Sequence, residues 1–233
     1  ATIKDRQQVG LQINGDGPLG EIYGLADADG QVRVTIAAPR GEPAGAKETL
    51  RLASAIGFGR FTVMKKLSED QAPYRGIIPI VSGEIAQDLA EYYLSSEQIP
   101  SAVALGERME KEGITAAGGY LIQALPGADE DELDAVMRRI AALPPLGDLF
   151  AMGVGPEAIL DRLFDDAEIL ATTDVKFHCP CSREQFARKL CTIGEDELRK
   201  LTEDDEEIVT ECQFCRATYA FDRDQINALL YGA

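Results

Sequence analysis

The sequence contains only one histidine, His178, and it lacks both an H-E-x-x-H metalloprotease motif and a G-x-S-x-G nucleophile elbow. Histidine is the side chain that most often transfers protons in catalysis, because its pKa lies near neutrality. No catalytic constellation is therefore visible, and we expect that the protein is not an enzyme.

Basic residues are also scarce. Lys and Arg total 23 against 40 Asp and Glu, which gives a formal net charge of −17. Nucleic acids and anionic membranes both need a basic surface on the protein that binds them. We therefore expect neither nucleic acid nor a membrane as a partner. A strongly acidic surface instead suits a soluble protein that must resist self-association.

Long hydrophobic runs are missing as well. No apolar stretch approaches the roughly 18 residues that a membrane span needs, and residues 1–5 lack the apolar segment of a signal peptide. Five cysteines are present, and four of them cluster at spacings typical of metal ligands, which favours a reducing compartment over a secreted disulfide framework. These features predict a cytoplasmic protein.

The chain has 233 residues, 45% of them hydrophobic, which is enough for one domain with a buried core and a smaller second domain. Val9, Leu11 and Ile13 alternate with polar residues, and turns rich in Asn, Asp and Gly separate this segment from two similar ones. Further elements are predicted as strands at 61–64, 77–81, 102–105 and 116–125, and as a helix with Ile85, Leu89, Tyr92 and Tyr93 on one face. The pattern predicts an α+β fold, with an antiparallel, β-rich core domain that contains helices and ends near Pro126.

The string Gly15-x-Gly17-x-x-Gly20 matches a dinucleotide-binding fingerprint. That site needs a helix directly after the glycines, whereas here Pro18 interrupts the string and a strand-like segment follows. We therefore interpret the string as a hairpin turn.

The next fifty residues or so predict short amphipathic helices. Asp129 and Glu132 form a candidate capping box, Pro144-Pro145 ends the first helix, and Pro156 suits the first turn of another. The apolar positions of these helices are Leu133, Val136, Met137, Ile140, Ile159, Leu160, Leu163 and Phe164. Helices of this length persist only when they pack on something else. We expect a helical linker at about 127–174 whose structure depends on its neighbours.

Four cysteines form two tight pairs near the end of the chain, Cys179-Pro180-Cys181 and Cys212-Gln213-Phe214-Cys215. Thiolates are soft ligands that select Zn²⁺, and four of them close a structural site without an open position for substrate. The same sulfurs could instead be oxidised pairwise into two disulfides. The two chemistries exclude each other, so the site could act as a switch.

The segment 175–233 is too short for a large core, so we expect bound zinc to supply much of its folding free energy, about 10–16 kcal/mol for structural sites of this kind. Disulfides that close loops of a few residues stabilise little. Oxidation should therefore unfold this segment. Its predicted elements are a helix at 195–201, a strand at 218–221, and a last helix capped by Asp222 and Gln225 that carries Ile226, Leu229 and Leu230.

Other residues near the pairs have simpler interpretations. Cys191 is predicted to be a small, partly buried hydrophobe, with an auxiliary thiol as the alternative. His178 adjoins Cys179, but neighbours on an extended strand point to opposite sides, and four thiolates already complete the zinc shell. The acidic run at 203–207 is predicted to be a solvated surface, with an interaction surface as the alternative.

Several segments of the sequence resemble the bacterial redox-regulated chaperones of the heat shock protein 33 family. The resemblance extends from about residue 8 to residue 227 in the right order, and the combination of Cys-x-Cys with Cys-x-x-Cys at this separation is highly specific. The segments that carry it are residues 177–186 (FHCPCSREQF), 212–215 (CQFC), 92–101 (YYLSSEQIPS), 116–126 (AAGGYLIQALP) and 12–18 (QINGDGP).

The resemblance implies an ATP-independent holdase that binds unfolding client proteins under oxidative stress and is inactive when reduced and zinc-bound. It implies one zinc per chain on Cys179, Cys181, Cys212 and Cys215. Oxidants such as hypochlorous acid, or peroxide with heat, would form the disulfides Cys179–Cys181 and Cys212–Cys215 and release the zinc. The linker would then unfold, expose a client-binding surface and favour a homodimer.

The implied domains are a core chaperone domain at 1–126, a metastable helical linker at 127–174 and a Cys₄ zinc redox-switch domain at 175–233. Family members begin with a further strand and a long helix, so we expect the core domain of this chain to lack both. Without the family resemblance, the residues and their spacing leave two alternatives to a chaperone open. One is a structural zinc ribbon that binds a partner protein, and the other is a thiol–disulfide oxidoreductase, which needs an exposed cysteine of low pKa.

Overall fold

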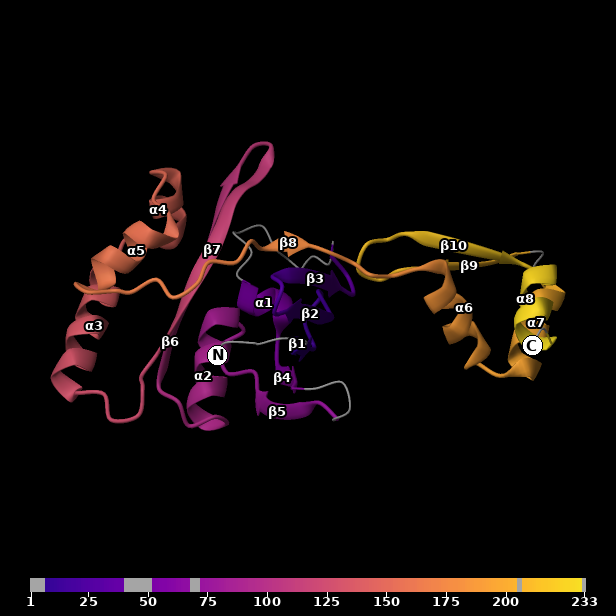
Figure 1. Cartoon of the computed structure of the whole chain (residues 1–233), viewed down its shortest axis with the longest axis horizontal. Coiled ribbons are helices and arrows are strands. Elements are labelled where there is room, and N and C mark those ends of the chain that lie inside the picture. The colour runs from indigo at the N-terminus through magenta and orange to yellow at the C-terminus, as the bar shows by residue number, and fades with distance from the viewer. Residues whose placement is uncertain (1–6, 40–51, 68–71, 205–206, 232–233) are drawn as a thin grey trace.

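The computed structural model describes residues 7–39, 52–67, 72–204 and 207–231. Three parts follow one another along the longest axis of the molecule (Figure 1). A β-sheet with one covering helix lies in the middle, a long hairpin with three helices lies at one end, and the cysteine-containing part lies at the other end. The α+β fold predicted from the sequence, with antiparallel sheets and a C-terminal cysteine cluster, is confirmed.

The central sheet has six strands in the order β5-β4-β1-β2-β3-β8. All neighbours are antiparallel except β3 and β8, which run parallel. The strands are β1 (Gln8–Gly15), β2 (Glu21–Asp27), β3 (Gln31–Ile36), β4 (Gly59–Lys66), β5 (Tyr74–Pro79) and β8 (Lys176–Phe177). The predicted meander of the first three strands is confirmed, and the Gly15–Gly20 string forms the turn between β1 and β2.

One face of this sheet forms the main core. Ile13 of β1 lies opposite Ile22 and Phe61 on its two neighbours, so these side chains share a face. Helix α2 (Ile85–Ser95) covers this face with Tyr92 and Tyr93, as the sequence periodicity predicts. The core residues of the cluster are Ile13, Ile56, Phe61, Val63, Ile78, Ile80, Tyr92 and Tyr93. The short helix α1 (Leu52–Ile56), which the sequence pattern did not indicate, contributes Ile56.

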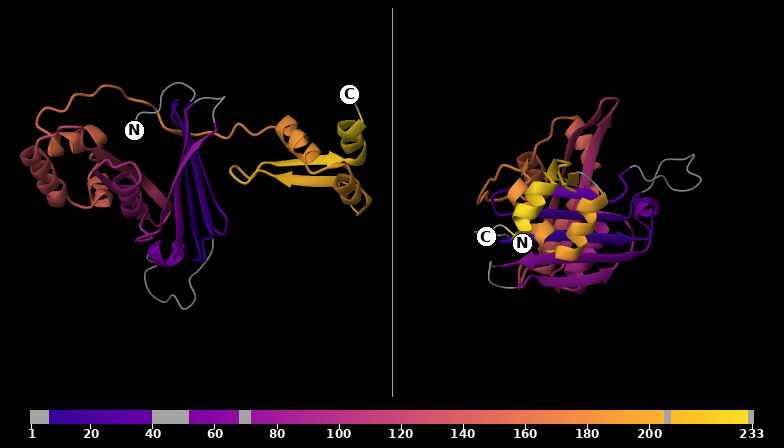
Figure 2. Two further views of the ribbon diagram at one scale, coloured as in Figure 1. Left: turned by 90° about the horizontal axis from the view of Figure 1, so that it is seen from below. Right: turned by 90° about the vertical axis from the view of Figure 1, so that its right-hand side faces the viewer.

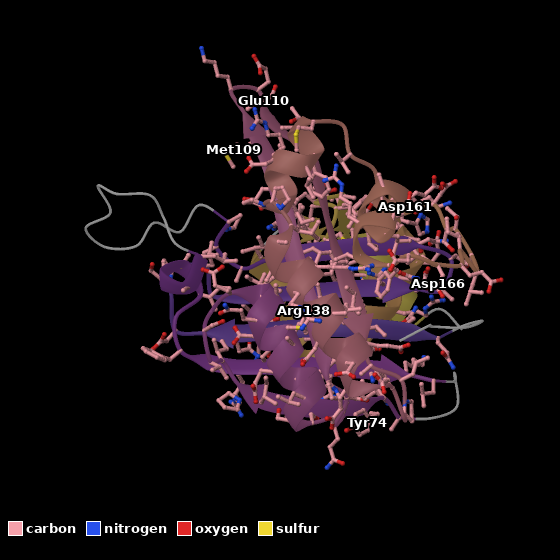
Figure 3. The ribbon with its side chains drawn as sticks, turned by 90° about the vertical axis from the view of Figure 1, so that its left-hand side faces the viewer. Tyr74, Met109, Glu110, Arg138, Asp161 and Asp166 are labelled. Carbon is pink, nitrogen blue, oxygen red and sulfur yellow. The ribbon has the colours of Figure 1, made fainter. Side chains whose placement is uncertain are left out.

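A second, two-stranded sheet is a long hairpin of β6 (Ser101–Glu110) and β7 (Gly113–Gln123). Its strands are the predicted ones at 102–105 and 116–125, but they form a separate sheet instead of joining the central one. The tip of the hairpin projects beyond its neighbours, and Figure 3 shows Met109 and Glu110 there. Met109 and Ile114 near the tip are 69% and 62% exposed, so the tip presents apolar side chains to solvent.

The expected linker helices pack against this hairpin. They are α3 (Glu130–Ala142), α4 (Leu146–Ala151) and α5 (Pro156–Leu163), and α4 was missed because it has only six residues. Asp129 accepts hydrogen bonds from the backbone N–H groups of Asp131 and Glu132, so the predicted cap of the first helix is confirmed. The buried residues of this cluster are Leu146, Leu149, Ile159 and Leu163, with Ala104, Tyr120 and Ile122 of the hairpin packed against them.

After α5 the chain runs in extended form from residue 165 to β8, and all its residues from 165 to 178 are exposed. β8 then pairs with the edge of the central sheet, although its residues belong to the predicted C-terminal domain. The C-terminal part follows, with α6 (Arg183–Cys191), α7 (Glu195–Asp204), β9 (Glu207–Glu211), β10 (Thr218–Asp222) and α8 (Arg223–Tyr231). No helix in the described ranges is both long and apolar enough to cross a membrane.

The small C-terminal part has its own core of Leu190, Leu198, Phe221 and Ile226. Asp222 and Gln225 cap α8 reciprocally, since each side chain accepts a hydrogen bond from the other residue's backbone N–H. Helix α6 and strand β9 were not predicted. A signal for α6 was present, because Ser182 followed by Gln185 is a helix-start signature and the Ser182 hydroxyl accepts from the Gln185 N–H.

Candidate metal centre

The second cysteine pair lies in the turn between β9 and β10. The backbone N–H of Cys212 donates to the carbonyl of Ala217, and the N–H of Arg216 donates back to the carbonyl of Cys212, both at 2.8 Å. Arg216 has a φ of 61°, a left-handed conformation that a tight turn requires and that glycine adopts more easily. The hairpin therefore folds the four residues of Cys-x-x-Cys into a loop that presents both sulfurs on one side.

The first pair is held between the central sheet and a helix. On one side, the N–H of His178 donates to the carbonyl of Val32 at 3.1 Å, which anchors the residue before Cys179. On the other side, Ser182 caps α6 directly after Cys181. The Cys-Pro-Cys segment thus spans a short gap between two fixed points.

The four sulfur atoms of Cys179, Cys181, Cys212 and Cys215 come together within 4.8 Å of one another. The Cys179 and Cys212 sulfurs are 3.6 Å apart, and those of Cys181 and Cys215 are 3.3 Å apart. A tetrahedral site with Zn–S bonds of about 2.3 Å has sulfur–sulfur edges of about 3.8 Å. The spacing and the soft donor set therefore fit a single zinc ion, with Cys212 buried and the other three sulfurs in half-buried residues.

The other two predicted residues lie outside this group. His178 is exposed, and its backbone N–H donates a hydrogen bond to the central sheet. The cluster consists of the four cysteine sulfurs and does not include the imidazole of His178. Cys191 is exposed at the end of α6, so the prediction of a partly buried hydrophobe is wrong. The helix turns Phe186 and Leu190 toward the small core, which leaves position 191 on the solvent side. Of the acidic run, Asp205 and Glu206 lie outside the described residues, and Glu207 is exposed.

Tyr219 is a member of the site that the spacing of the cysteines did not reveal. Its hydroxyl lies 3.2 Å from the sulfur of Cys181 and donates to the carbonyl of Cys181, also at 3.2 Å. Its ring packs on Phe186 of α6, with the centroids 5.0 Å apart. Tyr219 therefore connects the strand β10, the first helix of the module and one cysteine of the cluster.

The thiols of the cluster differ in acidity. Burial alone raises the pKa of Cys212, but the backbone N–H groups of Cys215 and Phe214 and two neighbouring thiols donate to its sulfur, so its pKa falls to about 7. For Cys181, the bond from Tyr219 lowers the pKa, yet burial and the other thiols outweigh it and raise the pKa to about 12. Burial also raises the pKa of Cys179. Cys212 is thus ready to be a thiolate near neutrality, whereas a bound cation would favour ionisation of Cys179 and Cys181.

Comparisons with known proteins agree with this arrangement. A family model described as Hsp33 protein matches residues 1–222. The 33 kDa chaperonin of Syntrophotalea carbinolica is 39% identical over 231 residues, which cover 98% of this chain and 80% of that protein. The 33 kDa chaperonin of Bacillus cereus strain AH187 is 35% identical, with coverage of 99% and 80%.

A solved structure shows the same fold. The crystal structure of the 33 kDa chaperonin of Thermotoga maritima, a heat shock protein 33 homolog, matches with a TM-score of 0.88 at 29% sequence identity. The match covers 98% of this chain and 79% of that one. Together with the family model and the curated relatives, it shows that this chain belongs to the Hsp33 family of chaperones.

Proposed function

We propose that this chaperone is an ATP-independent holdase that is inactive when reduced and zinc-bound and is activated by oxidation. The observation that carries the proposal is the cluster of four sulfurs within 4.8 Å, which can hold a metal or form disulfides but cannot do both. Its partners would be unfolded or partly folded client proteins. We also propose that the oxidised form is a homodimer, and that the chain works as a core at 1–126, a linker at 127–174 and a switch at 175–233.

In the reduced state, Cys179, Cys181, Cys212 and Cys215 would hold one zinc ion. Bound zinc would supply folding free energy, about 10–16 kcal/mol for comparable structural sites. The C-terminal part would depend on this contribution because, among its described residues, the core cluster is small and consists of Leu190, Leu198, Phe221 and Ile226. Cys212, with its pKa of about 7, would ionise more readily than Cys179 and Cys181, whose pKa values are raised.

Oxidation would remove the ligands. In each pair, two thiolates lose two electrons and form one sulfur–sulfur bond, while hypochlorous acid takes up the electrons and a proton and leaves as chloride and water. We assign the disulfides Cys179–Cys181 and Cys212–Cys215. In the closed cluster each sulfur also has a neighbour in the other pair, but residues within one pair stay close together as the module opens, whereas the two pairs separate. Disulfide sulfur is not a thiolate ligand, so the site would lose its zinc.

The linker is suited to respond to this change. Helix α3 has no fully buried residue, and the groove between α2, α3 and the β6–β7 hairpin is lined mainly by apolar side chains, among them Leu94, Leu133 and Met137. The only covalent connection from these helices to the switch is the exposed segment at 165–175. β8 fixes the far end of this segment to the central sheet. If β8 detached, the linker helices would lose one restraint on their position, and helices of this length persist only while they stay packed.

The test is the aggregation of a chemically denatured client protein, followed by light scattering. We expect suppression by the oxidised protein and none by the reduced, zinc-loaded protein. Oxidation should also release about one zinc per chain, as Cys₄ stoichiometry requires. Cys191→Ser is the matched control, because this cysteine is exposed and lies outside the cluster, and it should respond like the unchanged protein. Equal protection by both redox states would contradict the proposal.

A thiol–disulfide oxidoreductase is the second candidate, because the pKa of Cys212 is as low as about 7. Such an enzyme needs its reactive cysteine at the surface. Cys212 is instead 4% exposed, and it lies between the antiparallel strands β9 and β10, not in a βαβ unit. An insulin-reduction assay separates the candidates, and we expect no catalysis above the rate of free dithiol.

A further inference from the structure

The edge of the central sheet is covered by a very short strand. β8 has two residues, and its parallel pairing joins Gln31 to Lys176 and Val32 to Phe177. Two flanking hydrogen bonds extend the contact, from the Lys176 N–H to the Gly30 carbonyl at 3.0 Å and from the His178 N–H to the Val32 carbonyl at 3.1 Å. β3 itself continues to Ile36, so β8 covers only the beginning of this edge.

The cysteine module holds β8 in place by a second contact with the sheet. Phe214, between the two cysteines of the β9–β10 turn, has its ring centroid 5.9 Å from that of Tyr23 on β2. The guanidinium of Arg33 on β3 lies over the same ring at 4.9 Å. Tyr23 and Arg33 lie on the face of the sheet opposite the core. Figure 2 (left) shows the linker helices on one side of this sheet and the cysteine module on the other.

Both contacts depend on the closed cysteine cluster. Phe214 is fixed in space by Cys212 and Cys215, and β8 ends next to His178, which adjoins Cys179. Opening the cluster would therefore withdraw Phe214 and free β8 at the same time. β8 alone is too short to stay paired, because an isolated pair of this length is held by very few hydrogen bonds.

The uncovered edge has the features of a strand-accepting surface. The N–H and C=O of one residue point to the same side of a strand, and successive residues alternate. The carbonyls of Gly30 and Val32 point toward β8, so the backbone N–H and C=O groups of Val34 and Ile36 point toward the same open edge. The side chains of β3 also alternate, with Val34 on the core face, 52% exposed, and Arg33 on the opposite face. Within the described residues, pairing on this edge stops at Val32.

We propose that oxidation frees the start of the β3 edge, which β8 covers in the closed state, and so makes the edge from Gly30 to Ile36 long enough to bind an extended segment of an unfolded polypeptide, which adds to the sheet as β8 does. This inference rests on the proposed function, because it needs the redox opening. The chain's own segment occupies the edge in the structure, which shows that the edge accepts an extended strand. The favoured client segment alternates apolar residues, which pack beside Val34, with polar or acidic residues beside Arg33.

Hydrogen exchange on the unchanged protein tests this binding mode. We expect the amides of Val34 and Ile36 to become protected when the oxidised protein binds a denatured client, and to be unaffected by the client when the protein is reduced. Full chaperone activity without new protection at these amides would overturn the inference and leave the proposed function intact. Protection that appears without client and grows with protein concentration would also overturn it, because a second copy would then occupy the edge. If the oxidised protein suppresses no aggregation, the proposed function itself fails.

A pair of variants adds a functional readout. Val34→Pro removes the outward N–H of an edge residue, a position where proline is tolerated. Val34→Ala shortens the same side chain and keeps the N–H. After oxidation, we expect Val34→Pro to need about tenfold more protein for the same protection. Val34→Ala keeps the backbone hydrogen bond and loses only side-chain packing against the client, so its loss of protection should be clearly smaller. Both variants should release zinc normally. Equal activity of the two oxidised variants would overturn the inference.

Discussion

Tyr219 connects the four-cysteine cluster to the fold of its module. Its hydroxyl bonds to both the sulfur and the carbonyl of Cys181. Hydrogen bonds of this kind orient metal ligands, and their loss lowers metal affinity by about 10- to 100-fold. Tyr219 has a pKa of about 12, raised mainly by its bond to Cys181, so it is a donor at all physiological pH values.

We predict that Tyr219→Phe weakens zinc binding within that range and leaves the fold of the module intact, because the ring still packs on Phe186. Competition with a chromophoric chelator measures the affinity. Thr218→Ala changes an exposed neighbour on the same strand and is the control. An unchanged affinity in Tyr219→Phe would mean that the hydroxyl does not orient the ligand.

Glu97 ties the end of α2 to the central sheet. Its carboxylate lies 2.8 Å from the ammonium of Lys65 and accepts a hydrogen bond from the Tyr92 hydroxyl. Burial raises the pKa of Glu97, but the bonds from Lys65 and Tyr92 outweigh burial and lower it below the usual value. The ionised form is therefore favoured by folding.

A lowered pKa in the folded state sets the sign of the pH dependence. The stabilising contribution of Glu97 is present above its unfolded pKa of about 4.3 and is lost as the pH falls through the lower, folded pKa. We predict that urea unfolding of the core shows this acid loss and that Glu97→Gln reduces it. Gln87→Ala, an exposed change on the same helix, should keep the pH dependence of the unchanged protein.

At the scale of the elements, the contact of α4 with the β6–β7 hairpin depends on glycine. A Cβ added at Gly106 of β6 would lie 2.6 Å from the Cβ of Leu146, a buried residue at the start of α4. Real carbon atoms do not approach so closely, so the helix would have to move away from the hairpin. The docking of the linker is thus sensitive to one methyl group.

We predict that Gly106→Ala partly releases the linker and gives the reduced protein some chaperone activity. Overpacking of this kind destabilises by about 1–3 kcal/mol, which raises the released population by about 5- to 150-fold. Gly155→Ala is the matched control, because a Cβ there meets no atom within 4 Å. Light scattering with a denatured client, under reducing conditions with zinc bound, compares the two. Equal activity would show that docking of α4 does not restrain the protein.

The elements that the sequence predicted are those with a local pattern. Alternation indicated β1 to β3, and helical spacing indicated the buried face of α2. β8 was missed because two residues carry no periodicity and their strand partner is far away in the chain. At the candidate metal site, the residue type and spacing of the four cysteines predicted that they cluster, as they do. Tyr219 and Phe214 instead act through contacts between distant segments, which no local pattern records.

At the scale of the whole molecule, the central sheet and the cysteine module have separate cores. We predict that removal of zinc by a chelator from the reduced protein abolishes hydrogen-exchange protection in β9, β10 and α8. The amides of β1, β4 and α2 should remain protected, since their core does not include the module. Loss of protection in both regions would show that the two parts unfold together. Re-addition of zinc should restore the original pattern.

The exposed segment at 165–175 is the natural point of attack for a protease, because cleavage needs an extended and accessible backbone. A single cut there would separate the core and the linker helices from the proposed redox switch. Among the described residues, the contacts of β8, His178 and Phe214 with the central sheet would then hold the two pieces together. If the proposed function holds, limited digestion would activate the chaperone permanently, because no reductant can rejoin the cut backbone.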